Sequence, residues 1–505
     1  MKIMARLSEA ILGLACLGCT TAMVGCTVGP DYERPDVNVP RGWNQTVAGS
    51  GSTVAADLRQ WWTLLGDDTL NDLIDQAGWA NLDARASLMR VAQSRALRDF
   101  TAGRGAPQLD GIGAYSRMRD SAETRFAAPG MPTDPYDLHA VGFDAAWEID
   151  LFGQIRRSVE SSQASLEASI DDYHDVLRTL FAEVARNYVE LRTTQARLRY
   201  ARQNIEAQRR TVELTEGRFE AGLSGELDVA QAKLNLANTE AEVPALRLAE
   251  IQIINRIAVL LGRYPQDLQM DLAGEGAIPE AVEPGGPGLP ADLLRRRPDI
   301  RRAERELAAQ TARIGVATAD LYPSFTLSGV FTLQAEDFGD IGKWNSRAYS
   351  FGPGFRWYIL GGDRVRSNIR RETAAAEQAR LRYEQTVLLS VEEVENALAS
   401  LLQDRQRLAS LQRSTDESER SVRLVQEQYT SGLTDFQNVL DMQRTLWMQQ
   451  DRLAAGRGEI ILDLIRLYKA LGGGWSMEGS EPNDPAAGAD ASQPQQHPVE
   501  RHSRP

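Results

Sequence analysis

The chain has 505 residues, a formal net charge of −14, four histidines and three cysteines. The acidic balance and the lack of a basic stripe argue against a nucleic-acid partner. Two histidines lie in the C-terminal tail and all the cysteines lie within the first 26 residues, so a metal or catalytic centre of these residue types has little to build from. There is no phosphate-binding glycine loop and no nucleophile-elbow serine. We therefore expect no enzyme activity, no catalytic residue, no metal and no cofactor.

The first 25 residues have the layout of a signal peptide. Two basic residues precede the apolar run Ile11–Cys19, and small residues follow it. The text Met23-Val24-Gly25-Cys26 is similar to a bacterial lipobox, which predicts cleavage before Cys26 and acylation of its thiol. The alternative is that Cys26 is an ordinary residue near a cleavage site. Several acyl chains give stable membrane attachment, and Thr27, in place of aspartate, favours the outer membrane.

The elements of the first half follow in chain order. Residues 26–80 form a lead-in and equatorial segment, at mid-height of the predicted molecule, with a short helix near Asp68–Trp79. Residues 81–262 form a first repeat. Its predicted parts are a helix over 81–106 that stops before Pro107, a β-hairpin within 107–150, a long helix over 156–221, a tip turn at 221–225 and a helix over 226–261. The hairpin is predicted from period-two alternation, with apolar residues at Val141, Phe143, Ala145, Trp147 and Ile149.

The second half repeats the first. Gly222 aligns with Gly432 at an offset of 210, and Asp83 aligns with Asp299 at an offset of 216, as one six-residue insertion between Pro107 and Trp147 would produce. A connector at the same equatorial level spans 263–298. The second repeat, 299–472, comprises a helix over 299–322, a β-hairpin within 323–360, a long helix over 364–431, a tip turn at 431–435 and a helix over 436–470; a tail over 473–505 ends the chain.

Each predicted strand has the length and pattern of a tilted membrane-spanning strand. Runs of roughly 10–12 residues alternate an aromatic-rich apolar face with a small or polar face. The residues expected at the membrane interfaces are Trp147, Phe325, Phe355 and Trp357. The alternative is a half-buried sheet of a soluble protein, which fits any one strand but does not explain why each hairpin lies between very long helices.

The long helices carry a heptad pattern, which predicts left-handed supercoiling. In the first, apolar residues from Ile170 to Ile205 follow a 3-4 spacing that Asn187 and Thr194 interrupt. Each long helix is about 100 Å long at 1.5 Å per residue, as are two shorter helices stacked end to end.

Four strands cannot close a barrel, and an open edge is not tolerated in lipid. Three chains would supply twelve strands.

Ordered motifs then identify a family. They are Cys26-Thr27-Val28-Gly29-Pro30-Asp31-Tyr32 with Pro35, Trp61-Trp62 with Leu64 and Gly66-Asp67, Asn81-Leu82-Asp83, Trp147-Glu148-Ile149-Asp150-Leu151-Phe152-Gly153, Arg296-Arg297-Pro298-Asp299-Ile300 and Leu440-Asp441-Met442-Gln443-Arg444. From about Cys26 to Gly474, the chain resembles the TolC-like outer-membrane efflux proteins, and most closely their lipoprotein branch. The resemblance implies a mainly helical homotrimer with a twelve-stranded transmembrane β-barrel on a helical periplasmic tunnel.

The resemblance also implies partners and sites. The partners are a periplasmic adaptor (a membrane fusion protein) and an inner-membrane pump, usually proton-driven. The tip residues Gly222, Leu223, Gly432 and Leu433 match the family's adaptor-contacting loops, although they could simply turn the chain. Asp441 and Arg444 match a pair associated with closing the tunnel; the alternative is an ordinary pair on one helix face. Some relatives have leucine where Gln437 stands, so we expect a polar closure and not an apolar plug.

These expectations give a passive efflux duct in the bacterial outer membrane, lipid-anchored, with its helical tunnel in the periplasm. One alternative is the outer duct of a type I protein or peptide secretion system. Another is a coiled-coil scaffold of the envelope without a pore. No methionine or histidine ladder singles out copper or silver, and the sequence does not identify the exported compound.

Overall fold

The computed structural model of the chain describes residues 27–44, 58–119, 121, 134–274, 276–280 and 290–475. The predicted signal peptide 1–25, the predicted acylation site Cys26 and the tail from residue 476 lie outside this range. The chain divides into two units, described separately below. Unit 1 holds the residues up to Val37, Gln93–Ser169 and Arg302–Gln385, and unit 2 holds the others.

Among the helices of the described residues, none combines the length and the apolar character that a membrane crossing requires.

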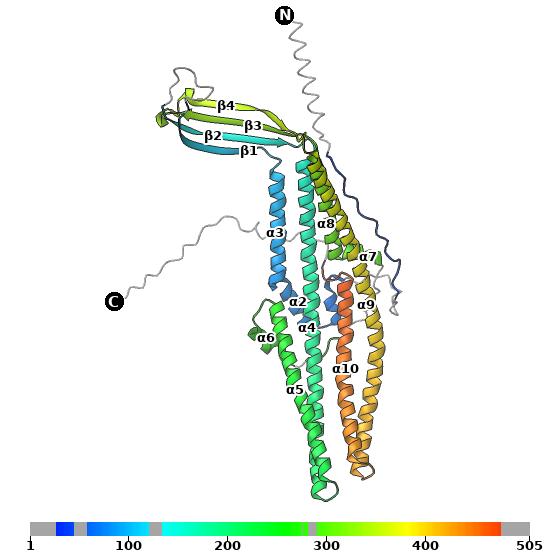
Figure 1. Ribbon diagram of the computed structural model, residues 1–505. Coiled ribbons are helices and arrows are strands. Elements are labelled where there is room, and N and C mark those ends of the chain that lie inside the picture. Colours follow the sequence, from blue (N-terminus) through cyan, green and yellow to red (C-terminus); the bar gives the residue numbers. More distant parts are fainter. Residues whose placement is uncertain are drawn as a thin grey trace, which may run out of the picture. The chain divides into compact units, whose positions relative to one another are not determined.

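Unit 1 contains an antiparallel sheet in the order β1-β2-β3-β4 (Figure 1). The strands are β1 (Gln108–Met118), β2 (Tyr136–Ile149), β3 (Ser324–Ala335) and β4 (Arg347–Arg356). β2 and β3 pair although they come from different repeats, and Gly142 lies opposite Thr332 in their register. A Cβ atom on Gly142 would lie 2.0 Å from the backbone oxygen of Phe331, so only glycine allows this close approach.

Two tryptophans fix the strands of unit 1 to the ends of the preceding helices. The indole N–H of Trp147 donates to the carbonyl oxygen of Gly105 at 3.0 Å, and that of Trp357 donates to the carbonyl oxygen of Leu321 at 3.0 Å. The donors are 210 residues apart and the acceptors 216. The internal repeat is therefore present in the hydrogen bonds as well as in the sequence.

Hydrogen bonds and close backbone packing hold the segment after Cys26 in place within unit 1. The N–H of Val28 donates to the carbonyl oxygen of Phe152 at 3.2 Å. The buried guanidinium of Arg157 donates to Asp31 at 2.6 Å. At Gly29 a Cβ atom would lie 2.4 Å from the Cα atom of Gly315, so the two backbones touch. The start of the lead-in is thus fixed against two helices of the same unit.

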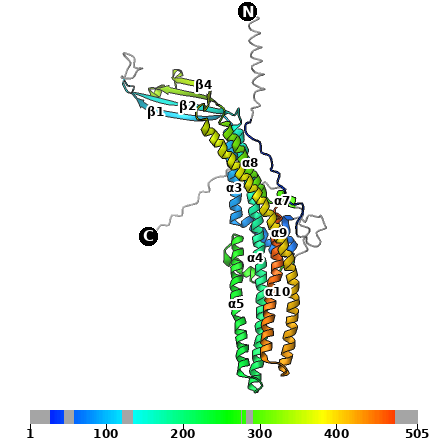
Figure 2. The same ribbon diagram turned by 45° about the vertical axis from the view of Figure 1, so that its right-hand side comes forward.

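The helices form two long pairs, α4 with α5 and α9 with α10, whose partners run side by side in Figures 1 and 2. The helices are α2 (Asp68–Ala80), α3 (Leu82–Gly103), α4 (Gln154–Glu220), α5 (Glu226–Leu260), α6 (Pro265–Leu272), α7 (Pro290–Arg296), α8 (Pro298–Ala319), α9 (Gly362–Thr430) and α10 (Phe436–Ala470). The heptad seam of α4 is buried from Leu180 to Ile205, including Asn187 and Thr194. The chain is mainly helical with a small sheet, as predicted; trimeric closure of a barrel stays a prediction.

An aromatic cluster anchors the lead-in of unit 2. Trp61 stacks on Tyr468 with ring centroids 5.5 Å apart, and Trp62 meets Phe181 edge-on at 5.0 Å. Asp67 accepts from the N–H of Leu70 and so caps α2. These buried rings hold the lead-in in a short 3₁₀ helix at Leu58–Leu65, which the sequence did not predict. The connector 263–298 likewise contains two short helices, α6 and α7, which bury Leu268, Leu272 and Leu293.

Candidate functional site

The two tips of unit 2 have the same backbone geometry. Gly222 and Gly432 adopt left-handed φ angles of 73° and 72°, which glycine reaches without strain. The N–H of Leu223 donates to the carbonyl oxygen of Arg218 at 2.8 Å, and that of Leu433 donates to the carbonyl oxygen of Gln428 at 2.8 Å. The leucine side chains remain 66% and 78% exposed. Each tip therefore presents one apolar side chain on a rigid turn.

A small core fastens the two tips to each other. Its buried residues, from three helices, are Ala232, Val425, Tyr429, Phe436, Val439 and Leu440. The guanidinium of Arg218 lies 4.7 Å from the centroid of the Tyr429 ring and donates to the carbonyl oxygen of Thr430 at 3.3 Å. Arg218 lies in the last turn of α4, and Tyr429 lies near the end of α9. The two tips are thus one packed body within unit 2.

The predicted gate residues lie on the first turns of α10, and their hydrogen bonds differ from a simple pair. Gln437 donates to Asp441 at 3.0 Å, and Asp441 is exposed. The Nε of Arg444 donates instead to Asn235 of α5 at 3.1 Å. Asn235 is buried, and its Nδ2 has no hydrogen-bond partner among the described residues. Asp441 is therefore exposed in the single chain, while Arg444 ties α10 to α5.

A further bond strengthens this link. Gln443 is buried and donates from Nε2 to Thr211 Oγ1 of α4 at 2.8 Å. Adjacent residues of α10 thus reach two different helices of the other pair. The sequence did not indicate Asn235 or Thr211, because each lies more than 200 residues from its partner and no periodicity connects them.

The predicted interface aromatics all lie in or beside the sheet of unit 1. Phe325 pairs with Phe355 across β3 and β4, with ring centroids 6.1 Å apart. Trp147 is on β2, and Trp357 follows β4 directly. The rings of Phe355 and Trp357 are 70% and 51% exposed. Such exposed aromatic surface suits an apolar surrounding better than water.

A second set of residues, quoted as motifs but without a predicted role, caps the helices that return from the tips. Asn81 Nδ2 donates to the carbonyl oxygen of Leu260 at 2.9 Å at the end of α5. Arg297 Nη1 donates to the carbonyl oxygen of Ala470 at 2.9 Å at the end of α10. These donors are 216 residues apart and the acceptors 210. The offset between the two repeats, applied to these motifs, could have identified Asn81 and Arg297 as equivalent residues from the sequence.

Comparisons with known proteins agree over nearly the whole described chain. The sequence profile of the family described as "Outer membrane efflux protein" matches residues 73–263 and 289–473. "Nodulation protein T" of Rhizobium leguminosarum bv. viciae is 32% identical over 475 residues, 93% of this chain and 94% of that protein. "Solvent efflux pump outer membrane protein SrpC" of Pseudomonas putida is 30% identical over 464 residues, 90% of this chain and 96% of that protein.

Among solved structures, the outer-membrane channel OprN superposes on this chain with a TM-score of 0.81 at 37% sequence identity. The match covers 89% of this chain and 100% of that chain.

Proposed function

Because the chain belongs to the outer membrane efflux protein family, we propose that it is the outer-membrane channel of a tripartite efflux pump. It gives drugs or other small toxic compounds a passive exit from the periplasm to the exterior. An inner-membrane pump, proton-driven in this proposal, supplies the energy through a periplasmic adaptor. The observation that carries the proposal is the end-to-end similarity to the channel OprN.

The assembly proposed is a homotrimer. The sheet order puts β1 and β4 at the two edges of the four-stranded sheet. An unpaired edge is costly in lipid because its N–H and C=O groups find no water. Three copies joined edge to edge give twelve strands, enough to enclose an aqueous bore. A monomeric protein in lipid bilayers would contradict the assembly.

We propose the tips as the contact with the adaptor. Leu223 and Leu433 are exposed on turns whose backbone is already fixed, so little conformational entropy is lost when a partner covers them. The core that joins the tips keeps the two leucines in a constant relation within unit 2. An adaptor therefore meets a preformed apolar surface.

The function is tested by deletion of the gene and complementation. We expect the deletion strain to become more susceptible to drugs or solvents, and the intact gene to restore resistance. A panel of drugs, solvents and metals identifies the compound class. Unchanged susceptibility across the panel, with loss of a secreted protein or peptide, would support the secretion duct instead. A purified protein without conductance in planar bilayers would support the scaffold.

We propose Cys26 as the lipid attachment site of the mature chain. The contacts of Val28, Gly29 and Asp31 fix the position of the lead-in within unit 1. A lipid anchor at Cys26 would therefore be attached through a short, ordered segment. Cys26→Ser is expected to abolish labelling of the protein by radioactive fatty acid. Labelling that persists in this variant would show that another residue carries the lipid.

A further inference from the structure

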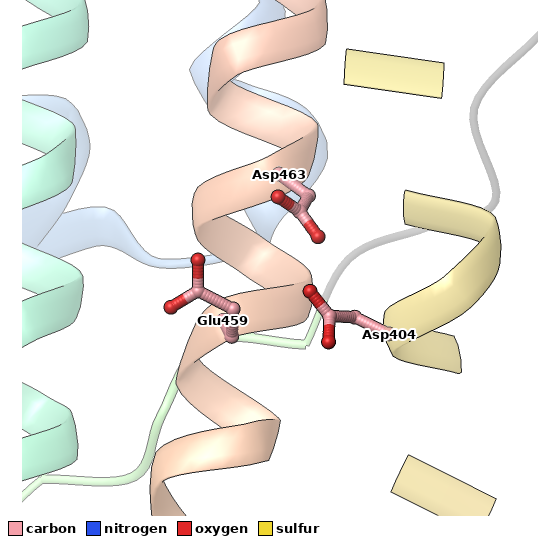
Figure 3. A group of neighbouring side chains, drawn as sticks. All are labelled: Asp404, Glu459 and Asp463. Carbon is pink, nitrogen blue, oxygen red and sulfur yellow. The ribbon is translucent and has the colours of Figure 1, made fainter. Parts of the chain in front are cut away.

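Three carboxylates converge between α9 and α10, away from the tips. Asp404 comes from α9, and Glu459 and Asp463 come from α10 (Figure 3). One oxygen of each lies within 4.8 Å of the others. In Figure 3 the carboxylates of Asp404 and Asp463 are directed toward each other, while that of Glu459 lies across the face of α10 and points away from Asp404. All three residues belong to unit 2.

Asp463 is the unusual member, because its side chain is fully buried at 0% exposure. Its Oδ1 accepts from Arg466 at 2.6 Å. Its Oδ2 is buried and has no hydrogen-bond partner among the described residues. A buried carboxylate oxygen without a partner is strongly destabilising. A proton or a bound cation at this oxygen would remove that cost.

Two guanidinium groups contact these carboxylates, and neither satisfies the second oxygen of Asp463. Arg466 Nη1 is shared between Asp463 at 2.6 Å and Glu459 at 2.8 Å. Arg407 lies 3.4 Å from Asp404 and is itself 60% exposed. Among the contacts of the described residues, one guanidinium group is thus shared by two of the carboxylates and the other is largely solvated. Asp463 Oδ2 remains without a partner there.

Burial raises the pKa of Asp463 to about 6. Arg466 opposes this increase, and the charges of Asp404 and Glu459 add to it. The ionised form is therefore held at a cost near neutral pH. A bound cation would remove this cost by neutralising the carboxylate.

We propose that Asp404, Glu459 and Asp463 bind a hard divalent cation, best matched by calcium, which joins α9 to α10. Calcium takes carboxylate oxygens at about 2.4 Å and tolerates irregular geometry, so oxygens that share one ion lie no more than about 4.8 Å apart, a limit that these three carboxylates meet. Magnesium binds at about 2.1 Å and demands a near-ideal octahedron, which three carboxylates from two helices supply less readily. Asp404 and Glu459 are partly exposed, which leaves room for water ligands and an entry path. The site is separate from the tips and does not depend on the proposed channel function.

The test uses the full-length protein in detergent, freed of metal with a chelator and titrated with calcium chloride by calorimetry. All variants are made in an Asp441→Asn background, so that carboxylates of the proposed gate do not contribute. We expect one calcium ion per chain and a calcium-dependent rise in melting temperature. Asp404→Asn and Asp463→Asn should each weaken calcium binding by at least about tenfold, because each removes a charged ligand. Glu392→Gln, an exposed carboxylate elsewhere on α9, should bind as the background does.

The outcomes distinguish a cation bound at Asp463 from a proton held on its carboxyl group. If Asp463→Asn raises the melting temperature in chelator and calcium has no effect on the background protein, the carboxyl holds a proton and the cation site is wrong. Calcium binding that is unchanged in both aspartate variants would also overturn it. Should both fail to fold, Glu459→Gln, at a partly exposed position, repeats the measurement and is expected to lose affinity likewise.

Discussion

Arg297→Met is expected to destabilise the folded chain by about 3–5 kcal/mol, the usual cost of removing one partner from a buried ion pair. The Arg297 side chain is 2% exposed. It donates two hydrogen bonds to Asp299, at 3.0 and 2.6 Å, and one to Glu393 at 2.7 Å. Methionine would fill most of the volume but leave the buried Asp299 carboxylate without its main partner. Thermal unfolding of the purified protein in detergent measures the effect.

The matched control is Arg295→Met, because Arg295 is exposed on α7, two residues before Arg297, and its melting temperature should stay close to that of the wild type. Arg297→Lys keeps the charge but loses the forked geometry, so it should lie between the two. Equal melting temperatures for Arg297→Met and Arg295→Met would contradict the predicted role.

The same network has a definite pH dependence. Burial alone would raise the pKa of Asp299, but hydrogen bonds from Arg297 and the charges of Arg178 and Arg297 outweigh it, so the pKa is lowered. A lowered pKa means that ionised Asp299 stabilises the fold at neutral pH. This contribution is present above the ordinary aspartate pKa and is lost as the pH falls through the lowered value. In Arg297→Met this acid-dependent loss should be smaller.

Asp441→Ala and Arg444→Ala are each expected to raise the single-channel conductance in planar bilayers several-fold. In the proposed homotrimer, three copies of Asp441 would lie near the tunnel axis, where like charges attract cations and accept interchain ion pairs. Arg444 acts through a second route, because it holds α10 to α5 through buried Asn235. Loss of that hydrogen bond should let the two helices separate more easily.

The two routes are distinguished by milder variants. Asn235→Ala removes the partner of Arg444 without changing any charge, and it should raise the conductance if the tether matters. Asp441→Asn keeps the size of the side chain, and it should reduce cation selectivity if the carboxylates act at the axis. Gln437→Leu tests the polar closure, since an apolar ring should lower the open probability. An unchanged conductance in both alanine variants would remove the electrostatic gate.

The sequence predicted well those elements whose signals are local. α10 is predicted over 436–470 and spans Phe436–Ala470, because a left-handed glycine turn marks its start and a second glycine marks its end. The strands follow from alternation, which needs only a few neighbouring residues. The short helices α6 and α7 were missed because prolines and glycines dominate the connector, and because tertiary burial of Leu268 and Leu293 stabilises them.

The site was predicted less completely, for a physical reason. The motif singles out Asp441 and Arg444 as gate candidates, but the partner of Arg444 is 209 positions away and its approach depends on how α5 packs. Asp463 reads in sequence as an ordinary helical acid near Arg466. Only the packing of α9 on α10 buries it and brings Asp404 alongside.

The tryptophan anchors of the sheet bear on the ancestry of the protein. The indoles of Trp147 and Trp357 donate to equivalent carbonyl groups, although the tryptophans are 210 residues apart and the carbonyl groups 216. Duplication and fusion of a half-length gene, followed by one insertion, accounts for both offsets. Such an ancestor would have carried two strands and one pair of long helices. Six copies of it would have supplied the same ring of strands that three present-day chains supply in the proposed homotrimer.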